Sequence, residues 1–346
     1  MKTLVTGAAG FIGYHLARRL AEAGGEVVGI DNLNEYYDVA LKHGRLSELG
    51  IKRVAAGESR SERHENLRFI RMDISDADAV RSLFERERFD RVCHLAAQAG
   101  VRYSIDAPFE YAEANMRGFL SLLEAARGAP PRHLVYASTS SVYGLNGTMP
   151  FSPHAAADHP VSLYAASKKA NEAMAHAYAH VFGLPLTGLR FFTVYGPWGR
   201  PDMAPIKFAK AISQRQSIDV YNNGRMRRDF TYIDDIIDGM VVVLDNPPTM
   251  QPGWDGEQAD PASSSAPYRI LNIGRGEPVE LMYFIRALER AFGHEVEKRY
   301  LPLQPGDMVS TWADTKDLEA LGYRPQVSID EGVRRFAEWY GSTDLV

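Results

Sequence analysis

The sequence predicts an α/β protein with a doubly wound parallel sheet and a smaller C-terminal lobe. Short apolar runs alternate with helical stretches through the first 192 residues, which is typical of such a sheet. A glycine-rich turn, TGAAGFIG at 6–13, joins the first predicted strand to the first predicted helix. The alternation stops after residue 192, where Pro197, Pro201 and Pro205 interrupt the chain and a mixed segment follows. We therefore expect a second, smaller lobe there.

The predicted elements follow one another in a regular order. The apolar runs predict strands at Thr3–Thr6, Glu26–Ile30, Leu67–Met72, Arg91–Leu95, His133–Ala137, Thr187–Phe192 and Tyr268–Ile273. The helical periodicity predicts helices at Phe11–Ala23, Asp76–Glu87, Tyr111–Ala126 and Leu163–Phe182. Strand–helix–strand repeats predict right-handed crossovers that place helices on both faces of the sheet.

Two segments are expected to be surface loops. Residues 52–66 are charged and show no periodicity, and residues 247–267 contain Pro, Gly, Asp and a Ser triplet. Since the strand predicted at Tyr268–Ile273 belongs with the sheet, we assign residues 1–192 and 233–274 to the first domain. Residues 193–232 and 275–346 form the second lobe.

Composition and charge exclude several classes of protein. Of the 346 residues, 45% are hydrophobic and 24% charged, which is typical of a globular chain rather than a disordered one. The net charge of -5 does not favour nucleic-acid binding, and no apolar run is long enough to span a membrane. Cys93 is the single cysteine, so a reducing compartment fits. The first residues do not resemble a signal peptide, and we expect a cytoplasmic protein.

The glycine-rich turn is typical of a dinucleotide site in a Rossmann sheet. Gly7, Gly10 and Gly13 lie three residues apart, directly after a strand and before a helix. A turn of this kind brings backbone N–H groups against a pyrophosphate at the positive end of the helix. A Cβ at the first two positions would block the turn or the ligand, and Gly13 would let the helix pack close to the sheet.

Two acids follow the next strands of the predicted sheet. Asp31 ends the second strand, where a carboxylate accepts hydrogen bonds from the adenosine ribose hydroxyls. It would also repel a 2′-phosphate, so NAD is favoured over NADP as the cofactor. Asp73 follows the third strand, where it could meet the adenine edge or serve as a helix cap or turn acid.

Tyr164 and Lys168 are the candidate chemical centre. They lie four residues apart on a predicted helix, so both side chains share one face. A phenol with its usual pKa of about 10 must be lowered by about 3, which costs about 4 kcal/mol, to act as a base near pH 7. A neighbouring ammonium and a positive nicotinamide can supply this, and such a phenolate can take a proton from an alcohol while hydride leaves the carbon.

A cluster of hydroxyls, Ser138 to Ser141, follows the fifth predicted strand. The carboxyl end of a parallel strand faces the crevice in which ligands bind, so these hydroxyls could contact a substrate. They could equally cap and shape a turn.

These motifs together resemble the extended short-chain dehydrogenase/reductases, and within them the NAD-dependent nucleotide-sugar epimerases and dehydratases. The resemblance rests on TGAAGFIG at 6–13, LAAQAGVRYS at 95–104, STSSVYG at 138–144, YAASK at 164–168, RFFTVYGPWGRPDM at 190–203 and RRDFTYIDD at 227–235. It covers nearly the whole chain. The finer match is most similar to the UDP-glucuronate 4-epimerase subgroup.

The resemblance implies roles for individual residues. It makes Tyr164, Lys168 and Thr139 catalytic. It assigns the cofactor NAD to Gly7, Gly10, Phe11, Ile12, Gly13, Asp31, Asn32, Asp73, Ile74, Leu95, Ala96, Ala97, Tyr164 and Lys168. It assigns the UDP-sugar to Arg102, Thr139, Ser140, Ser141, Thr193, Arg200 and Arg228, with Arg228 at the diphosphate. A homodimer built on two pairs of helices is also implied.

The residues after Thr139 favour one reaction. Dehydratases of the resembled family carry Asp-Glu there and decarboxylases typically a Glu, whereas this chain has Ser140 and Ser141. Neither hydroxyl shuttles protons near neutrality, but both can hold a uronic carboxylate. We therefore expect UDP-glucuronate 4-epimerisation through a 4-keto intermediate. A UDP-glucose/UDP-galactose or N-acetylhexosamine 4-epimerase, a UDP-glucuronate decarboxylase and a non-catalytic NAD sensor remain alternatives.

Other noticeable residues are expected to be structural. His176 and His180 lie on the helix of Tyr164 without a third ligand nearby, so no metal site is expected. Cys93 lies in an apolar strand, and Trp198 is expected either to shape the nucleotide site or to pack. Met116, Phe119, Leu120 and Leu123 form a helical stripe whose default position is the core.

Overall fold

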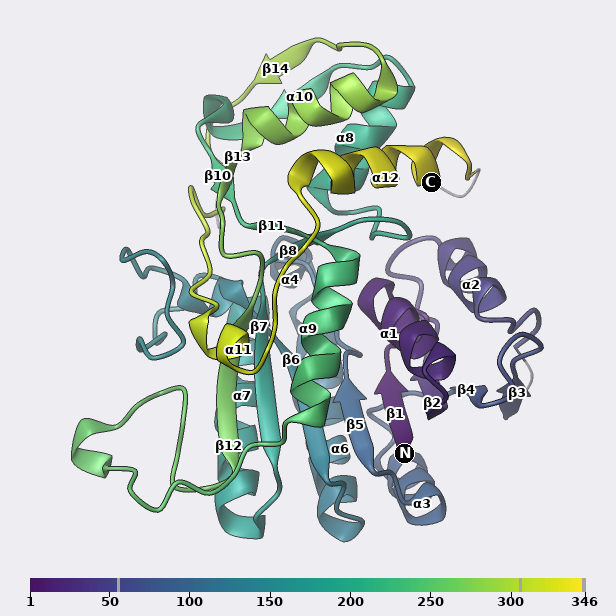
Figure 1. Cartoon of the computed structure of the whole chain (residues 1–346), viewed down its shortest axis with the longest axis vertical. Helices are drawn as coiled ribbons and strands as arrows, with labels where there is room; N and C mark the ends of the chain where they lie inside the picture. The colour runs from purple at the N-terminus through teal and green to yellow at the C-terminus, as the bar shows by residue number, and fades with distance from the viewer. Residues whose placement is uncertain (55–56, 305–306, 344–346) are drawn as a thin grey trace.

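The computed structural model describes residues 1–54, 57–304 and 307–343. A broad sheet with helices on both faces forms one part of the molecule, and a smaller group of helices and short strands lies beyond one end of that sheet (Figure 1). The predicted fold class is confirmed. No helix in the described ranges is both long and apolar enough to cross a membrane.

The large sheet has eight strands, and seven of them run parallel. Their order is β12 (Tyr268–Ile273), β7 (Leu186–Phe191), β6 (His133–Thr139), β5 (Arg91–His94), β1 (Lys2–Thr6), β2 (Glu26–Asp31), β4 (Leu67–Arg71) and β3 (Glu58–Arg60). The chain order reverses between β1 and β5, so loops diverge there and leave a crevice at the carboxyl ends of the strands. Apart from Tyr164 and Lys168 on α7 (Leu163–Phe182), the cofactor and hydroxyl segments predicted in the first domain lie at or directly after the carboxyl ends of these strands.

Helices cover the two faces of this sheet. On one face, α1 (Phe11–Glu22) packs against α9 (Ile233–Asp245). On the other lie α3 (Ala77–Glu87), α6 (Gly118–Gly128) and α7 (Leu163–Phe182). Adjacent strand residues point to opposite faces, as Leu4 and Val5 show by joining two different hydrophobic clusters. This two-sided burial explains why the strands are apolar runs rather than alternating patterns.

The smaller part combines paired short strands with three helices. Its strands are β8 (Thr193–Tyr195), β9 (Ile218–Val220), β10 (Arg227–Arg228), β11 (Phe230–Tyr232), β13 (Val279–Glu280) and β14 (Lys298–Tyr300), paired as β8–β11, β9–β14 and β10–β13. Helices α8 (Ala204–Ser213), α10 (Leu281–Phe292) and α12 (Ile329–Gly341) pack on one another. The short helix η3 (Tyr221–Gly224) also belongs to this part, whereas α11 (Lys316–Ala320) lies beside β12 of the large sheet.

The segment between β2 and β4 differs from the prediction. Helix α2 (Val39–Glu48) was not expected, and the charged segment 52–66 contains β3, which pairs antiparallel with β4 instead of forming only a loop. Residues 55 and 56 of that segment lie outside the described residues. The second predicted loop, 247–267, is irregular apart from a 3-10 turn, η4 (Gly256–Gln258). An antiparallel edge strand needs no apolar run, so the composition of the segment gave no strand signal.

The predicted helix at Tyr111–Ala126 is interrupted. Two short helices, α4 (Tyr103–Asp106) and α5 (Pro108–Tyr111), lead into a π-helical segment, η1 (Ala112–Arg117), before α6. The apolar stripe divides accordingly: Phe119 and Leu123 are fully buried, whereas Met116 and Leu120 are about 40% exposed (41% and 42%). The expectation that the whole stripe belongs to the core was therefore wrong.

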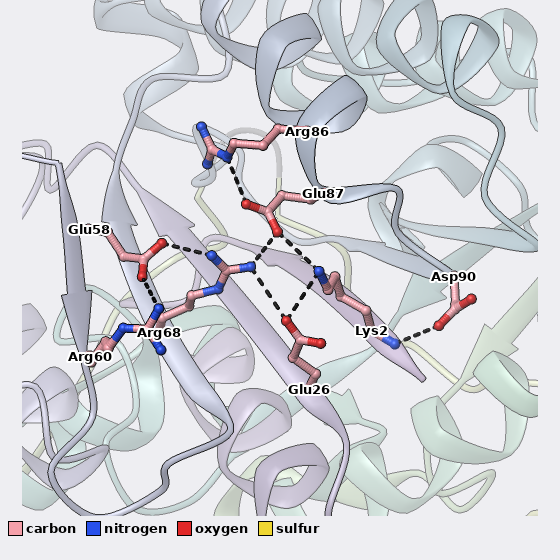
Figure 2. A network of polar contacts seen from close by, with 8 residues as sticks. All are labelled: Lys2, Glu26, Glu58, Arg60, Arg68, Arg86, Glu87 and Asp90. Carbon is pink, nitrogen blue, oxygen red and sulfur yellow. Dashed lines mark hydrogen bonds and ion pairs between the residues drawn. The ribbon is translucent and has the colours of Figure 1, made fainter.

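An ion network lies where β1, β2 and β4 begin, at the end of the sheet away from the carboxyl ends of the strands (Figure 2). Glu87 is at its centre and accepts hydrogen bonds from Lys2, Arg68 and Arg86. Burial would raise the pKa of Glu87, but these three cationic donors together lower it to about 2. The network thus stabilises the amino ends of the strands without touching the cavity.

Candidate active site

One cavity of about 1000 Å³ opens at the carboxyl ends of the strands, between the sheet and the smaller part. All the residues that the sequence analysis singled out for cofactor, substrate or chemistry line it. They are Gly7, Gly10, Phe11, Ile12, Gly13, Asp31, Asn32, Asp73, Ile74, Leu95, Ala96, Ala97, Arg102, Thr139, Ser140, Ser141, Tyr164, Lys168, Thr193, Arg200 and Arg228. Gly7 and Arg228, which are 221 positions apart in the chain, therefore meet in one space.

The glycine turn is shaped to receive a diphosphate. Gly7 has a φ of +71°, which favours glycine, and the Gly10 N–H donates to the Gly7 carbonyl at 2.8 Å. A Cβ on Gly13 would lie 2.1 Å from the Gly7 carbonyl oxygen, and one on Gly10 would lie 2.9 Å from it. The turn closes on itself at the N-terminus of α1 and leaves no room for a side chain at its three glycines, as a dinucleotide cradle requires.

Asp31 ends β2 and lines the cavity. Its carboxylate accepts from the N–H of Leu33 at 2.8 Å and lies 3.5 Å from the ammonium of Lys42, which also donates to Asn34. Lys42 lies on α2 and was missed, since its helix was not predicted. The acid is thus fixed in place at the edge of the pocket, in the position where ribose hydroxyls would donate to it.

Asp73 is a turn acid, which is one of the roles considered for it, and the contact with adenine stays a prediction. Its Oδ1 accepts from the N–H and hydroxyl of Ser75, as a turn acid does, while Oδ2 accepts from the Asn32 amide at 2.9 Å. Burial raises its pKa, but the hydrogen bonds from Asn32 and Ser75 lower it below the usual range. The cap of α3 is Asp76 instead. Asp73 therefore reaches the cavity as a fixed anion.

Tyr164 enters the cavity from the first turn of α7, which Ser162 caps by accepting from the Ala165 N–H. Burial raises the pKa of the phenol, and the hydrogen bond with Thr139 and the charge of Arg200 offset this only in part. The Lys168 ammonium, to which the sequence analysis gave a share of the lowering, is not one of these two influences. A positive nicotinamide beside the phenol would lower its pKa further.

Lys168 lies one turn further along α7 and is 2% exposed. Its Nζ donates to the carbonyl of Ala137 at 2.9 Å, and burial lowers its pKa to about 8. The hydrogen bond to β6 fixes the ammonium near the carboxyl end of this strand, which also carries Thr139. The four-residue spacing thus places both groups of the pair at the cavity, as the sequence predicted.

The hydroxyl cluster divides into three parts. Ser138 donates to the buried Glu172, which also accepts two hydrogen bonds from Arg190. Thr139 caps the 3-10 helix η2 (Ser140–Tyr143) by accepting from the Ser141 N–H at 3.2 Å. Ser140 and Ser141 line the cavity. Capping and ligand-facing roles therefore coexist in one cluster.

Arg200 is held from both sides of the cavity. Its guanidinium makes two hydrogen bonds to Asp202, at 3.0 and 2.5 Å, and lies 5.8 Å from the centre of the Tyr36 ring. Burial lowers its pKa, but Asp202 raises it well above the usual range. The Tyr36 hydroxyl also donates to Asp202, at 3.2 Å. Tyr36 and Asp202 were missed, although Asp202 stands two residues from Arg200 in the same motif.

Arg228 lies on β10 in the smaller part, and Arg102, from the loop after β5, reaches toward that part. Arg228 donates to the carbonyls of Arg227 and Val309, and burial lowers its pKa. Arg102 is about half exposed (52%), reaches Asp307 at 3.4 Å and lies over the Tyr221 ring. Both cations lack a close bidentate carboxylate partner in the described residues, so their charge is available to an anionic ligand.

Asn115 connects the catalytic helix to the loop after β5 and was also missed. Its side chain bonds the backbone of Gln98 at 2.8 and 2.9 Å and donates to the Ser167 hydroxyl. Asn171 then donates to the Asn115 carbonyl at 2.7 Å. Asn115 lies in the π-helical segment η1, and such segments occur frequently at functional sites. A π-helix has no simple periodicity signal, so the sequence did not reveal it.

The remaining residues have packing roles. Cys93 is fully buried in β5, as predicted, and burial raises its pKa. His176 donates to or accepts from Ser264 at 2.8 Å and stacks on His180. Trp198 packs between Tyr14 and Trp339, with ring centroids 6.0 and 5.6 Å away. No group of three or more potential metal ligands occurs in the part of the chain that the structure describes.

Comparison with known proteins places this cavity in a defined family. The model of the "NAD dependent epimerase/dehydratase family" matches residues 3–258, which is well over half of the chain. The chain belongs to this family. A probable UDP-glucuronate 4-epimerase of Rhizobium meliloti is 46% identical over 342 residues, covering 98% of this chain and 97% of the relative. Members of this family use NAD, and the glycine turn, Asp31 and Lys168 fit that cofactor.

Solved structures of the family share the whole fold. The UDP-glucuronic acid 4-epimerase of Bacillus cereus, in complex with UDP-glucuronic acid and NAD, superposes with a TM-score of 0.83 at 33% identity and 99% coverage of both chains. The UDP-glucose 4-epimerase of Thermotoga maritima, with UDP-glucose, has a TM-score of 0.82 at 26% identity, again with 99% coverage of both chains. The fold is thus common to enzymes for both sugars, and the cavity lining has to distinguish them.

Proposed function

We propose that this chain is an NAD-dependent UDP-glucuronate 4-epimerase, an isomerase that interconverts UDP-glucuronate and UDP-galacturonate. The observation that carries the proposal is the cavity wall after Thr139. Ser140 and Ser141 face the cavity there, in place of carboxylates. Short hydroxyls and the N–H groups of η2 can hold a sugar carboxylate, whereas two acids would repel it. The higher identity to the glucuronate relatives supports the same substrate.

The residues would divide the chemistry as follows. NAD, when bound, supplies the hydride acceptor and donor for C4 of the sugar. Tyr164, with Thr139 hydrogen-bonded to the same oxygen, removes the C4 hydroxyl proton and later returns it. Lys168 holds a positive charge beside the ribose and the phenol. Between the two proton transfers the 4-keto sugar turns about its diphosphate, which Arg228 anchors, and presents its other face.

The 4-keto intermediate creates a hazard that the cavity must control. It is a β-keto acid, and it loses CO2 when the bond to the carboxylate aligns with the carbonyl π system. We assign the grip on that carboxylate to Ser140, Ser141 and Thr193, with Arg200 at the sugar and Arg102 at the outer end of the substrate. A carboxylate fixed out of alignment keeps its carbon, so epimerisation wins over decarboxylation.

The direct test is incubation of the purified protein with UDP-glucuronate and, in parallel, with UDP-glucose, followed by separation of the sugars by chromatography. We expect UDP-galacturonate without consumption of NAD. A pentose product would indicate a decarboxylase, turnover of UDP-glucose alone would indicate the other epimerase, and no change would indicate an NAD sensor.

Ser141→Ala tests the carboxylate grip within the same assay. We expect weaker UDP-glucuronate binding and a pentose by-product, since one hydroxyl donor to the carboxylate is lost. Ser82→Ala is the matched control, because it removes an exposed hydroxyl from α3, outside the cavity lining. Unchanged affinity with no pentose would remove Ser141 from this role.

We also propose that the enzyme is a cytoplasmic homodimer. Exposed apolar side chains gather on the helices that flank the catalytic helix and on that helix itself: Phe109, Met116, Leu120, Leu163 and Phe182. Exposed apolar residues that are grouped on one face indicate an interaction surface, whereas scattered ones do not, and two copies of the chain could cover this face. The single, buried Cys93 supports a reducing compartment. We retain 1–192 plus 233–274 as the NAD-binding domain and 193–232 plus 275–346 as the UDP-sugar-binding lobe.

A further inference from the structure

The loop that joins β8 to α8 carries Arg200, and its backbone is unusual. Trp198 in this loop has a φ of +64°, a left-handed conformation that a bulky side chain rarely adopts. Such a conformation costs on the order of 1–3 kcal/mol and persists only where surrounding contacts hold it. The contacts that hold it come from the part of the molecule that contains the large sheet. They include Arg45 on α2, which lies 153 positions from Trp198 in the chain.

Three successive carbonyls of this loop are bound by two side chains. His15 on α1 bonds the Pro197 carbonyl through Nε2 at 2.9 Å. Arg45 on α2 donates to the Trp198 carbonyl from Nη2 at 2.7 Å and from Nε at 3.1 Å, and to the Gly199 carbonyl at 3.3 Å. Burial lowers the pKa of His15 to about 3, so the imidazole is neutral. Because the Pro197 carbonyl can only accept, Nε2 carries the proton. The next residue in the chain is Arg200.

The other end of the Arg45 guanidinium holds the phosphate turn. Nη1 donates to the carbonyl of Ala9 at 2.9 Å, within TGAAGFIG, and to the Tyr37 hydroxyl at 2.7 Å. Arg45 is 0% exposed and has no carboxylate at hydrogen-bond or ion-pair distance within residues 1–54, 57–304 and 307–343. Burying a cation without an anion is costly, so a guanidinium whose hydrogen bonds reach the carbonyls of two separate loops indicates more than packing.

We infer that Arg45, assisted by His15, is a positioning residue that ties the dinucleotide turn to the substrate loop and so sets where Arg200 meets the sugar. The inference rests on the proposed function only for the choice of ligand. Arg45 is not among the residues that line the cavity, so it acts through the backbone of the loop. Asp202 and Tyr36 then fix the Arg200 side chain on the scaffold that Arg45 provides.

A double-mutant cycle tests the inference. The dissociation constant of UDP-glucuronate is measured by calorimetry, with saturating NAD, for wild type, Arg45→Met, Arg200→Ala and the double variant. Arg45→Met should weaken binding about tenfold in the wild-type background and less than about twofold when Arg200 is absent. Binding of UDP, which lacks the sugar, should change less than about twofold in Arg45→Met. Arg45→Lys keeps the charge but not the fork, and should recover only part of the loss.

Two controls separate positioning from general destabilisation. Arg91→Met removes another buried arginine, paired with Asp245 at the opposite end of the sheet, and should lower the melting temperature without changing the dissociation constant. If Arg45→Met does not fold, His15→Leu replaces it, with a loss of about threefold and the same dependence on Arg200.

Equal losses in both backgrounds, equal losses for UDP, or wild-type binding in Arg45→Met would overturn the inference. These binding measurements need no turnover. A wild-type protein that binds UDP-glucuronate and leaves it unchanged would therefore refute the proposed function and leave the cycle interpretable.

Discussion

Tyr164→Phe is the change that most directly tests the proposed chemistry. Phenylalanine keeps the aromatic ring, which packs edge-on against Tyr111 with centroids 6.1 Å apart, and removes only the hydroxyl. Thr139 retains its hydrogen bond with Ser141, so the wall of the cavity stays in place. Binding of NAD and UDP-glucuronate should therefore change little, while the base that removes the C4 proton is lost.

The expected loss follows from what the hydroxyl does. A positioned general base contributes roughly 10²–10⁴-fold to a rate, so kcat should fall by about 10³, or about 4 kcal/mol of transition-state stabilisation. The pH dependence should change as well. Burial raises the pKa of Tyr164, so wild-type turnover should rise with pH as the phenol ionises, and the variant should lose this rise. Lys168, whose pKa is about 8, would still titrate in both proteins.

The assay is the initial rate of UDP-galacturonate formation, measured by chromatography from pH 6 to 10 in about half-unit steps. Tyr178→Phe is a matched control, because it removes a phenol from the same helix at a position outside the cavity lining. Turnover in Tyr164→Phe within about tenfold of wild type, or an unchanged rise with pH, would refute the reasoning.

Three further predictions concern the glycine turn and two buried carboxylates. Gly13→Ala should abolish retention of NAD, because its Cβ would lie 2.1 Å from a carbonyl of the turn, whereas Gly128→Ala, in open space, should retain it; bound NAD is measured by absorbance after denaturation. Glu87→Gln should lower the free energy of unfolding by about 2 kcal/mol at pH 7. Since its pKa is depressed to about 2, this difference is present above pH 4.5 and disappears as the pH falls toward 2, which urea titrations would follow. Glu172→Gln leaves the buried Arg190 without its anion and should cost about 3–5 kcal/mol, measured in the same titrations; a cost below about 1 kcal/mol would contradict it.

The parts that sequence predicted well share a local cause. Parallel strands buried on both faces are continuous apolar runs, so the strands around Val5 and Val135 are visible without knowledge of their partners. The glycine turn is visible for a similar reason, because its demand for missing side chains falls on Gly7, Gly10 and Gly13 within eight residues. Tyr164 and Lys168 are likewise placed together by one helix alone.

The parts that sequence missed depend on distant partners. Helix α2 turns Lys42 and Arg45 inward beside Leu41 and Leu46, so its buried face is half charged and its periodicity is lost. That burial is possible only because Asp31 receives Lys42, and carbonyls 153 and 154 residues away receive Arg45. No pattern within α2 reports these partners, which is why the sequence predicted no helix where one positions both halves of the cavity.

The same reasoning explains how one fold can serve several sugars. In the proposed function, the glycine turn, Asp31, Tyr164 and Lys168 act on parts of the reaction that do not involve C6 of the sugar, so they would not select a uronic acid. Selection must come from the two residues after Thr139 and from the loop that carries Arg200. The first are set by η2 at the end of β6, and the second by Arg45 from beneath the dinucleotide turn. We therefore expect a change in specificity to require changes at both places, since the proposed roles give the carboxylate to the first and the sugar to the second.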